Sequence, residues 1–232
     1  MVKLPGTIYL KNSDKESEIL AFGKSIDITD SDFKEGISRF GGFMRQPSYA
    51  HAYLKAAKIV LERAVDSEEL DELGLPVFYL VRHTMELKLK GLLEMAYDIL
   101  EMSIECYPNK YTVDILPSSR QRNRLKKSHD LDKLFNDLKM SCNTLDIEIP
   151  EEVFSSVMDL IREYEINPTW SRYSKSENGS HVGEEVVLPI VQLASSLEKL
   201  FEVVSYDQED HSESLESELY FMFTSLTSIM DE

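Results

Sequence analysis

The side chains best suited to chemistry lie in one stretch of the sequence, residues 74 to 102. Arg82, Glu86 and Lys90 follow at four-residue steps, so they are neighbours on one face of a helix. His83 lies three residues before Glu86, a spacing at which the carboxylate can hold one tautomer of the imidazole. An imidazole can move a proton near neutral pH, and a guanidinium can hold the charge of a phosphate. The same pattern also fits a solvent-exposed helix face whose charged side chains form ion pairs with one another.

The element that must position these residues is a central helix over residues 74 to 102. At 3.6 residues per turn its apolar side chains form two faces with the polar stripe between them, so we expect at least two other helices to cover it. The main apolar face comprises Phe78, Val81, Met85, Leu89, Leu92, Leu93 and Ala96, and the second comprises Leu80, Leu87, Gly91 and Met95.

Periodicity and capping signals predict further helices around the central one. Pro150 followed by two glutamates is a strong helix start, and Ser128 or Asp130 can cap the helix that follows the basic cluster. Residues 103 to 128 read as a long connection. The expected helices cover residues 47 to 64, 128 to 140, 150 to 164, 184 to 206 and 212 to 230.

Composition limits the classes of function. The chain of 232 residues is 42% hydrophobic, with a net charge of -17, which argues against wide, non-specific binding to nucleic acid. Residues 118 to 127 nevertheless hold five basic side chains and no acidic one, which leaves room for a local basic site. The sequence shows neither a signal peptide nor a membrane span, so we expect a cytoplasmic protein. Two isolated cysteines, and one histidine with one glutamate, predict neither a disulfide framework nor a metal site.

The pattern Tyr79-Leu80-x-Arg82-His83-x-x-Glu86, with His129-Asp130-Leu131 further along, resembles prokaryotic HEPN-like helical proteins, many of them toxins or phage-defence components. The resemblance covers about a third of the chain. HEPN ribonucleases share an Arg-x(4 to 6)-His motif, and two overlapping matches end on His129: Arg124 with four residues between and Arg122 with six. Both arginines precede the expected helix, which departs from the family. Residues 170 to 173, Trp-Ser-Arg-Tyr, resemble a segment that follows the fourth helix in this group.

We therefore predict an all-α HEPN-like helical bundle (residues 46–206) with an irregular N-terminal arm (1–45), an acidic linker and a C-terminal accessory helix (207–232). The expected function is that of an effector or accessory subunit in phage defence or a toxin–antitoxin pair, acting as a metal-independent endoribonuclease without a cofactor. The resemblance implies a homodimer, for which the C-terminal helix is a candidate contact, and a partner protein from a defence or antitoxin operon. RNA would bind through the local basic patch. The rival interpretation is a catalytically silent helical module that binds a partner protein or a nucleotide. The predicted catalytic residues are His129, Arg124, Arg122, Arg82, His83 and Glu86, and the predicted binding residues are Lys90, Trp170, Arg172 and Tyr173.

Overall fold

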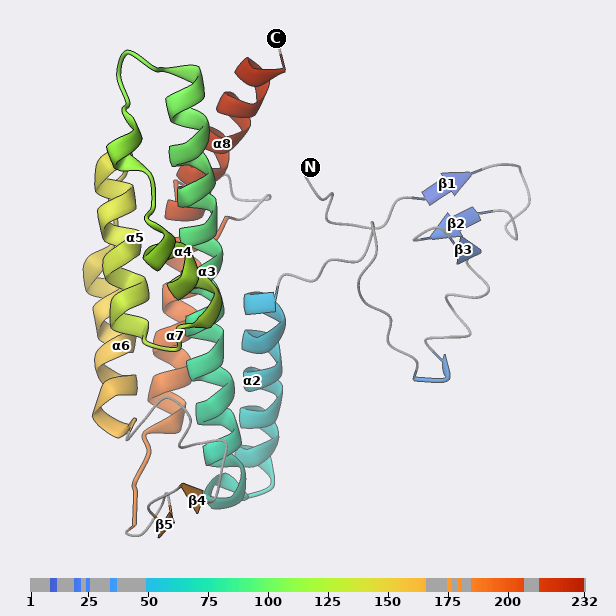
Figure 1. Ribbon diagram of the computed structural model, residues 1–232. Coiled ribbons are helices and arrows are strands. Elements are labelled where there is room, and N and C mark those ends of the chain that lie inside the picture. Colours follow the sequence, from blue (N-terminus) through green and yellow to red (C-terminus); the bar gives the residue numbers. More distant parts are fainter. Residues whose placement is uncertain are drawn as a thin grey trace. The chain divides into compact units, whose positions relative to one another are not determined.

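The computed structural model divides into two compact units, Met1–Ala52 and Tyr53–Glu232. Figure 1 shows the chain with its elements labelled, and each unit is described by itself. The residues that the structure describes are 49–165, 185–206 and 213–231, with the short segments 9–11, 19–21, 24–25, 34–36, 175–176 and 179–180.

The described part of the first unit contains a small antiparallel sheet in the order β1-β2-β3, with Tyr9 opposite Ala21. The sequence predicted extended segments here but not their pairing, because pairing joins residues that lie apart along the chain. The strands are β1 (Tyr9–Lys11), β2 (Ile19–Ala21) and β3 (Lys24–Ser25).

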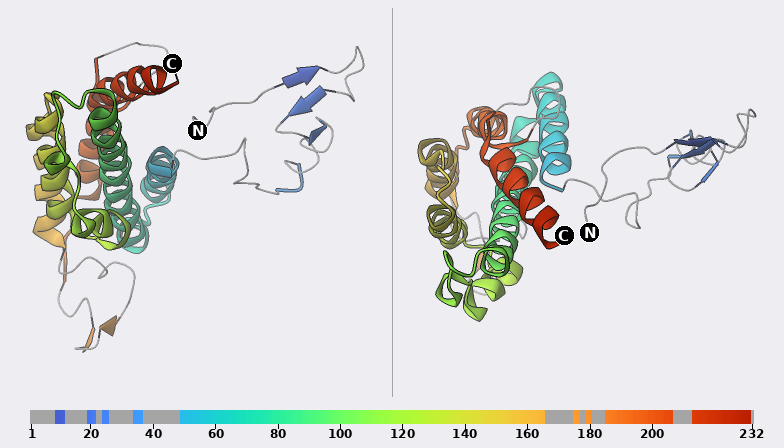
Figure 2. Two further views of the ribbon diagram at one scale, coloured as in Figure 1. Left: turned by 45° about the horizontal axis from the view of Figure 1, so that its top comes forward. Right: turned by 90° about the horizontal axis from the view of Figure 1, so that it is seen from above.

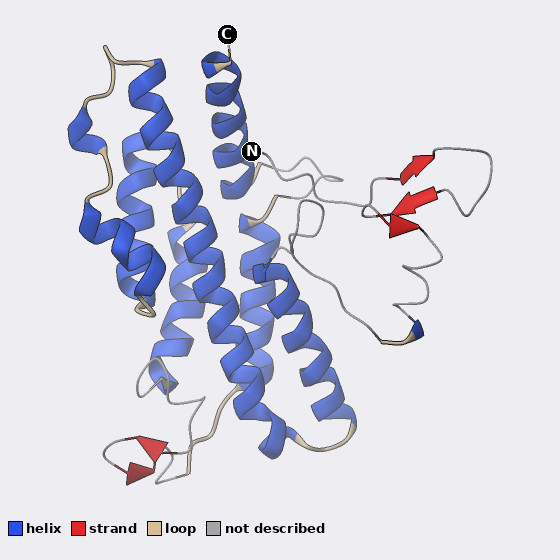
Figure 3. Ribbon diagram, turned by 45° about the vertical axis from the view of Figure 1, so that its right-hand side comes forward, coloured by secondary structure: helices blue, strands red, loops and turns tan. Residues whose placement is uncertain are grey.

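The described part of the second unit is helical, apart from its connecting loops and the short pair β4 and β5 (Figure 3), which confirms the all-α class. The right-hand view of Figure 2 shows this unit from above, with α5 and α6 on one side of α3 and α2 on the other. The helices are α2 (Tyr49–Asp66), of which the part from Tyr53 onward belongs to this unit, α3 (Leu70–Cys106), α4 (Ser119–Lys127), α5 (Leu131–Leu145), α6 (Glu151–Tyr164), α7 (Ile190–Val204) and α8 (Leu215–Met230), with a 3-10 turn at Val113–Ile115 and the strands β4 (Lys175–Ser176) and β5 (Gly179–Ser180).

Helix α3 is the central element of this unit, as predicted. It packs against α5, α8, α7 and α4, and its main apolar face is fully buried. The helix starts at Leu70, before the predicted start at Gly74, and Pro76 lies inside it. Pro76 is the seventh residue and lies beyond the first turn, so its missing N–H leaves the carbonyl of Glu72 without its usual backbone donor.

The expected long connection over residues 103 to 128 is wrong at both ends, because α3 continues to Cys106 and the basic cluster forms α4. Ser118 and Gln121 make a reciprocal capping box, in which the hydroxyl of Ser118 accepts from the Gln121 backbone N–H and the Gln121 side chain accepts from the Ser118 N–H. Both donors would otherwise be unsatisfied at the helix start. This cap stabilises a helix that is almost entirely polar. Its sequence therefore lacks the periodic apolar residues from which a helix is predicted.

Helix α8 docks on the body of its own chain and adds to the core. The apolar side chains spaced along this helix were expected to dock either on the body of the chain or on a second copy. Leu215, Leu219 and Leu226 are buried within the chain, as the first alternative requires. The ammonium of Lys88 on α3, itself 3% exposed, lies 2.7 Å from Oε2 of Glu216 on α8. Burial lowers the pKa of Lys88, and the charge of Glu216 opposes that shift. The pair therefore links the last helix to the centre of the bundle.

Replacement of Leu89 by alanine tests the central position of α3. Leu89 is fully buried, and we expect Leu89→Ala to lower the free energy of unfolding by roughly 2 to 5 kcal/mol through lost burial and a residual cavity. Ile59→Ala is the control, because Ile59 on α2 is 56% exposed and should cost less than about 0.5 kcal/mol. Urea unfolding followed by circular dichroism measures both, and equal losses would contradict a core position for Leu89.

Candidate functional site

A buried network centred on Arg82 joins three parts of the chain. Arg82 is 2% exposed. Its Nε donates to Oε1 of Glu165 at 2.7 Å, and its two terminal nitrogens donate to Glu86 and to the backbone carbonyl of His129. The guanidinium thus ties α3 to the turn between α4 and α5 and to the end of α6. With all three nitrogens engaged, Arg82 positions other groups and does not face a ligand.

Glu86 holds the imidazole of His129. Nδ1 of His129 lies 3.0 Å from Oε1 and 3.1 Å from Oε2 of Glu86, while Lys90 donates to Oε1 at 2.8 Å. A carboxylate at Nδ1 selects the tautomer with hydrogen on that nitrogen, which leaves Nε2 as the basic nitrogen. Nε2 makes no hydrogen bond to any residue that the structure describes. Because the His129 side chain is 46% exposed, this nitrogen can meet a ligand.

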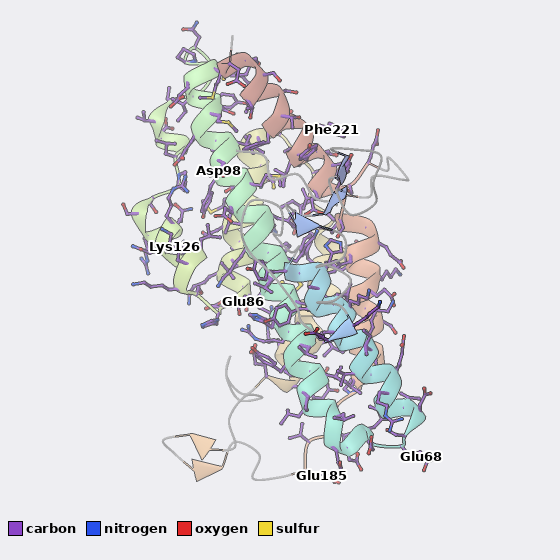
Figure 4. The ribbon with its side chains drawn as sticks, turned by 90° about the vertical axis from the view of Figure 1, so that its right-hand side faces the viewer. Glu68, Glu86, Asp98, Lys126, Glu185 and Phe221 are labelled. Atoms are coloured by element: carbon purple, nitrogen blue, oxygen red, sulfur yellow. The ribbon has the colours of Figure 1, made fainter. Side chains whose placement is uncertain are left out.

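The short turn between α4 and α5 places His129 opposite α3. The Ser128 hydroxyl accepts from the backbone N–H of Asp130 at 3.1 Å, and the Asp130 carboxylate caps α5 by accepting from the backbone N–H of Lys133 at 3.0 Å. Asp130 is therefore the predicted cap, and α5 begins at the next residue, Leu131. These local bonds, with the Arg82 contact to the carbonyl, fix the backbone of His129. Figure 4 shows Glu86 and the α4 residue Lys126 on the same side of the bundle.

A surface cavity of about 200 Å³ adjoins this turn. It brings the histidine together with the exposed arginine Arg162, whose guanidinium pairs with Asp132 and Asp159. The cavity is lined by His129, Asp130, Leu131, Asp132, Met158, Ile161, Arg162 and Glu165.

His83 lies apart from this network. Its ring stacks on Tyr79 at 5.6 Å between centroids and meets the Tyr53 ring of α2 edge-on at 4.7 Å. The hydrogen bonds of Glu86 go instead to Arg82, Lys90 and His129. The predicted pairing of Glu86 with His83 is therefore wrong, and the imidazole that Glu86 holds is that of His129.

The two arginines of the predicted motif lie on α4 and face acidic side chains. The Arg124 guanidinium lies 2.8 Å from both carboxylate oxygens of Asp137 on α5. Arg122 pairs with Glu101 of α3 and lies over the Tyr97 ring at 5.5 Å from its centroid. In the described part of the chain neither arginine forms an ion pair or hydrogen bond with His129. Both arginines are therefore engaged in fastening α4 to its neighbours.

Three of the predicted binding residues, Trp170, Arg172 and Tyr173, lie outside the described residues.

Arg162 and Glu165 belong to the site but were not predicted from the sequence. The signal for them was weak, since both lie near the end of α6 just before Asn167-Pro168, where a helix boundary was expected. Their nearness to His129 depends on how α6 packs, which no local pattern encodes.

The ionised carboxylate of Glu86 should make the stability of the fold depend on pH in the acid range, and this dependence tests the network. Burial raises its pKa, but hydrogen bonds from Lys90 and His129 and the charges of Lys90 and Arg82 outweigh burial, so its pKa lies below the usual 4.5. A carboxylate with a lowered folded-state pKa stabilises the fold above 4.5, and this contribution is lost as the pH falls through the folded-state value.

We therefore expect the difference in unfolding free energy between the wild type and Glu86→Gln to shrink as the pH drops below 4.5. Urea titrations across this range measure it. Glu152→Gln, at an exposed position of α6, is the control for the effect of the substitution itself. A difference that stays constant with pH would contradict the ionised network.

Among the described residues, no group of three or more histidine, cysteine, aspartate and glutamate side chains could hold a metal ion. No helix in the described segments is long and apolar enough to cross a membrane. Comparison with protein-family models, with curated proteins and with solved structures found no match to this chain.

Proposed function

We propose that this chain is an HEPN-like effector or accessory subunit of a phage-defence or toxin–antitoxin system, and that the His129 site cleaves RNA without a metal ion. The observation that carries the proposal is the His129–Glu86 pair at 3.0 Å beside a surface cavity. A histidine held by a buried carboxylate, with its second nitrogen exposed, is the arrangement that general base catalysis uses. The active form in this proposal is a homodimer in the cytoplasm, and light scattering at micromolar concentration tests the dimer.

The proposed reaction is attack within the RNA strand. Nε2 of His129 takes the proton of a ribose 2′-hydroxyl, the O2′ attacks the adjacent phosphorus, and the bond to the 5′-oxygen of the next nucleotide breaks. The products are a 2′,3′-cyclic phosphate and a 5′-hydroxyl, whose oxygen takes up a proton from water. The anionic carboxylate of Glu86 stabilises the imidazolium that forms.

We propose that Arg162 stabilises the negative charge of the phosphate during cleavage. Arg82 and Arg124 are held by the buried carboxylates of Glu86 and Asp137. Arg122 pairs with the exposed Glu101 and does not line the cavity, whereas Arg162 is 55% exposed and lines the same cavity as His129. Its partners Asp132 and Asp159 are also exposed. Exposed ion pairs contribute only about 0 to 1 kcal/mol, so a phosphate can displace these carboxylates from the guanidinium.

The experiment is cleavage of a labelled single-stranded RNA by purified protein in EDTA, with its proposed partner or trigger added. We expect cyclic phosphate ends from RNA and no cleavage of the DNA strand of the same sequence, because DNA lacks the attacking 2′-hydroxyl. Cleavage that requires added metal, or that proceeds equally on DNA, would refute the proposed chemistry.

A catalytically silent module that binds a partner protein or a nucleotide is the second candidate. Its support is that the arginines of the predicted motif are neutralised by Glu101 and Asp137, and that Asp130, Asp132 and Glu165 line the cavity. Acidic walls weaken phosphate binding and suit a cationic group, so this observation supports the partner protein and not the nucleotide. Absence of RNA cleavage with the partner present, together with a stable complex with that partner, would favour this candidate.

A further inference from the structure

Helix α4 divides its five basic side chains between two sides. Arg122 and Arg124 turn toward the bundle and pair with Glu101 and Asp137. Arg120, Lys126 and Lys127 are exposed and make no ion pair within the described residues. The sequence alone showed a uniform basic run, and the structure separates anchoring cations from cations that face outward.

The inward side chains hold α4 in place. Leu125, 9% exposed, is the one buried residue of this helix. The Arg124 contact to Asp137 and the Arg122 contacts to Glu101 and the Tyr97 ring supply the remaining attachments. Since the acidic partners are used by the inward arginines, the charge on the outward side is not cancelled by them.

The outward cations follow a helix that leads directly to the site. Arg120 and Lys127 are seven residues apart, about two helical turns or roughly 10 Å, so both lie on one side of α4. Lys127 is the last residue of the helix and His129 follows it by two positions. In a chain with a net charge of -17, these three cations form a local positive surface next to the histidine.

We propose that the outward face of α4, defined by Arg120, Lys126 and Lys127, binds the phosphate backbone of single-stranded RNA and guides it to His129. This inference rests on the proposed function and adds the surface that holds the substrate. Point charges on flexible lysine stems suit phosphates, which they contact without a fixed geometry. An acidic protein segment would be attracted by the same charges, but the nearby histidine favours a ligand that carries a reactive phosphodiester.

The proposal predicts how strongly the affinity for RNA depends on salt concentration. If the three α4 cations neutralise three phosphates of a single strand, they should contribute about -2 to the slope of log affinity against log salt. A fourfold rise in salt should then weaken binding about sixteenfold through these contacts. Removal of all three cations should reduce the magnitude of this slope by about 2, leaving only the contribution of Arg162.

The test measures binding separately from cleavage. Fluorescence anisotropy of a labelled single-stranded RNA is followed against KCl concentration in the His129→Ala protein, which does not consume the probe. The binding variant adds Arg120→Ala, Lys126→Ala and Lys127→Ala. A charge-matched control carries Lys55→Ala, Arg63→Ala and Lys199→Ala instead, which removes exposed cations from α2 and α7. Polyglutamate is the second probe, and circular dichroism verifies the fold of each variant.

We expect the α4 variant to lose more than tenfold in RNA affinity together with most of its salt dependence, and the control to stay within twofold of the parent. Equal losses in both variants, or tighter binding of polyglutamate than of RNA, would overturn the proposal. The two proposals fail in distinct ways. RNA binding that depends on α4 without any cleavage by the wild type refutes the nuclease alone, whereas cleavage that the three α4 substitutions leave unchanged refutes the docking surface alone.

Discussion

His129→Ala is expected to lower the rate of RNA cleavage by roughly 10²- to 10⁴-fold, the usual contribution of a positioned general acid or base. The ring is 46% exposed, so its removal leaves no large cavity and the fold should persist. Glu86→Gln should lower the rate as well, because an amide cannot stabilise the imidazolium and can hold the ring in the wrong tautomer. Single-turnover assays in EDTA, with melting curves for each variant, measure these effects.

His51→Ala is the matched control for this substitution. His51 is exposed on α2 and has no place in the proposed site, so cleavage should be unchanged. If the wild type cleaves RNA and His129→Ala cleaves it equally well, His129 is not the general base. If neither protein cleaves RNA with its partner and trigger present, the binding-module interpretation stands.

Arg82→Met should lower the free energy of unfolding by about 3 to 5 kcal/mol, the cost of removing one member of a buried ion pair. Methionine keeps much of the apolar stem but leaves Glu86, 2% exposed, without its guanidinium partner. Glu165 and the carbonyl of His129 lose their donor in the same step. Urea unfolding followed by circular dichroism measures the change.

Arg162→Met provides the comparison, because Arg162 pairs with carboxylates at the surface. Its side chain is 55% exposed, and exposed pairs contribute about 0 to 1 kcal/mol. We therefore expect a small change in stability for Arg162→Met alongside a loss of cleavage. A loss of stability as large as that of Arg82→Met would show that Arg162 has a structural role as well.

The main apolar face of α3 was predictable because burial of a long amphipathic helix leaves a period of 3.6 residues in the sequence. Phe78, Met85 and Leu93 are all fully buried, as that period requires. The prediction of a second apolar face was only partly correct. Leu80 and Leu87 are only half-buried and Gly91 is exposed, because an apolar residue at the edge of a helix does not need a complete cover.

The pairing of His129 with Glu86 could not be predicted, because it joins residues 43 positions apart. Local spacing favoured His83, which is three residues from Glu86 on the same helix but turns toward Tyr53 and Tyr79. Helix α4 was missed for a related reason. Its stability comes from a capping box and from ion pairs with α3 and α5, and none of these produces a hydrophobic period.

Because Lys88 is buried against Glu216, we expect substitutions at these two positions, 128 residues apart, to occur together. An enclosed ammonium that loses its carboxylate is strongly unfavourable, so a change at one position should be tolerated mainly when the other changes with it. A homologue whose chain ends before α8 should therefore carry an apolar residue in place of Lys88. A chimaera that exchanges C-terminal helices between homologues would have to transfer both residues together.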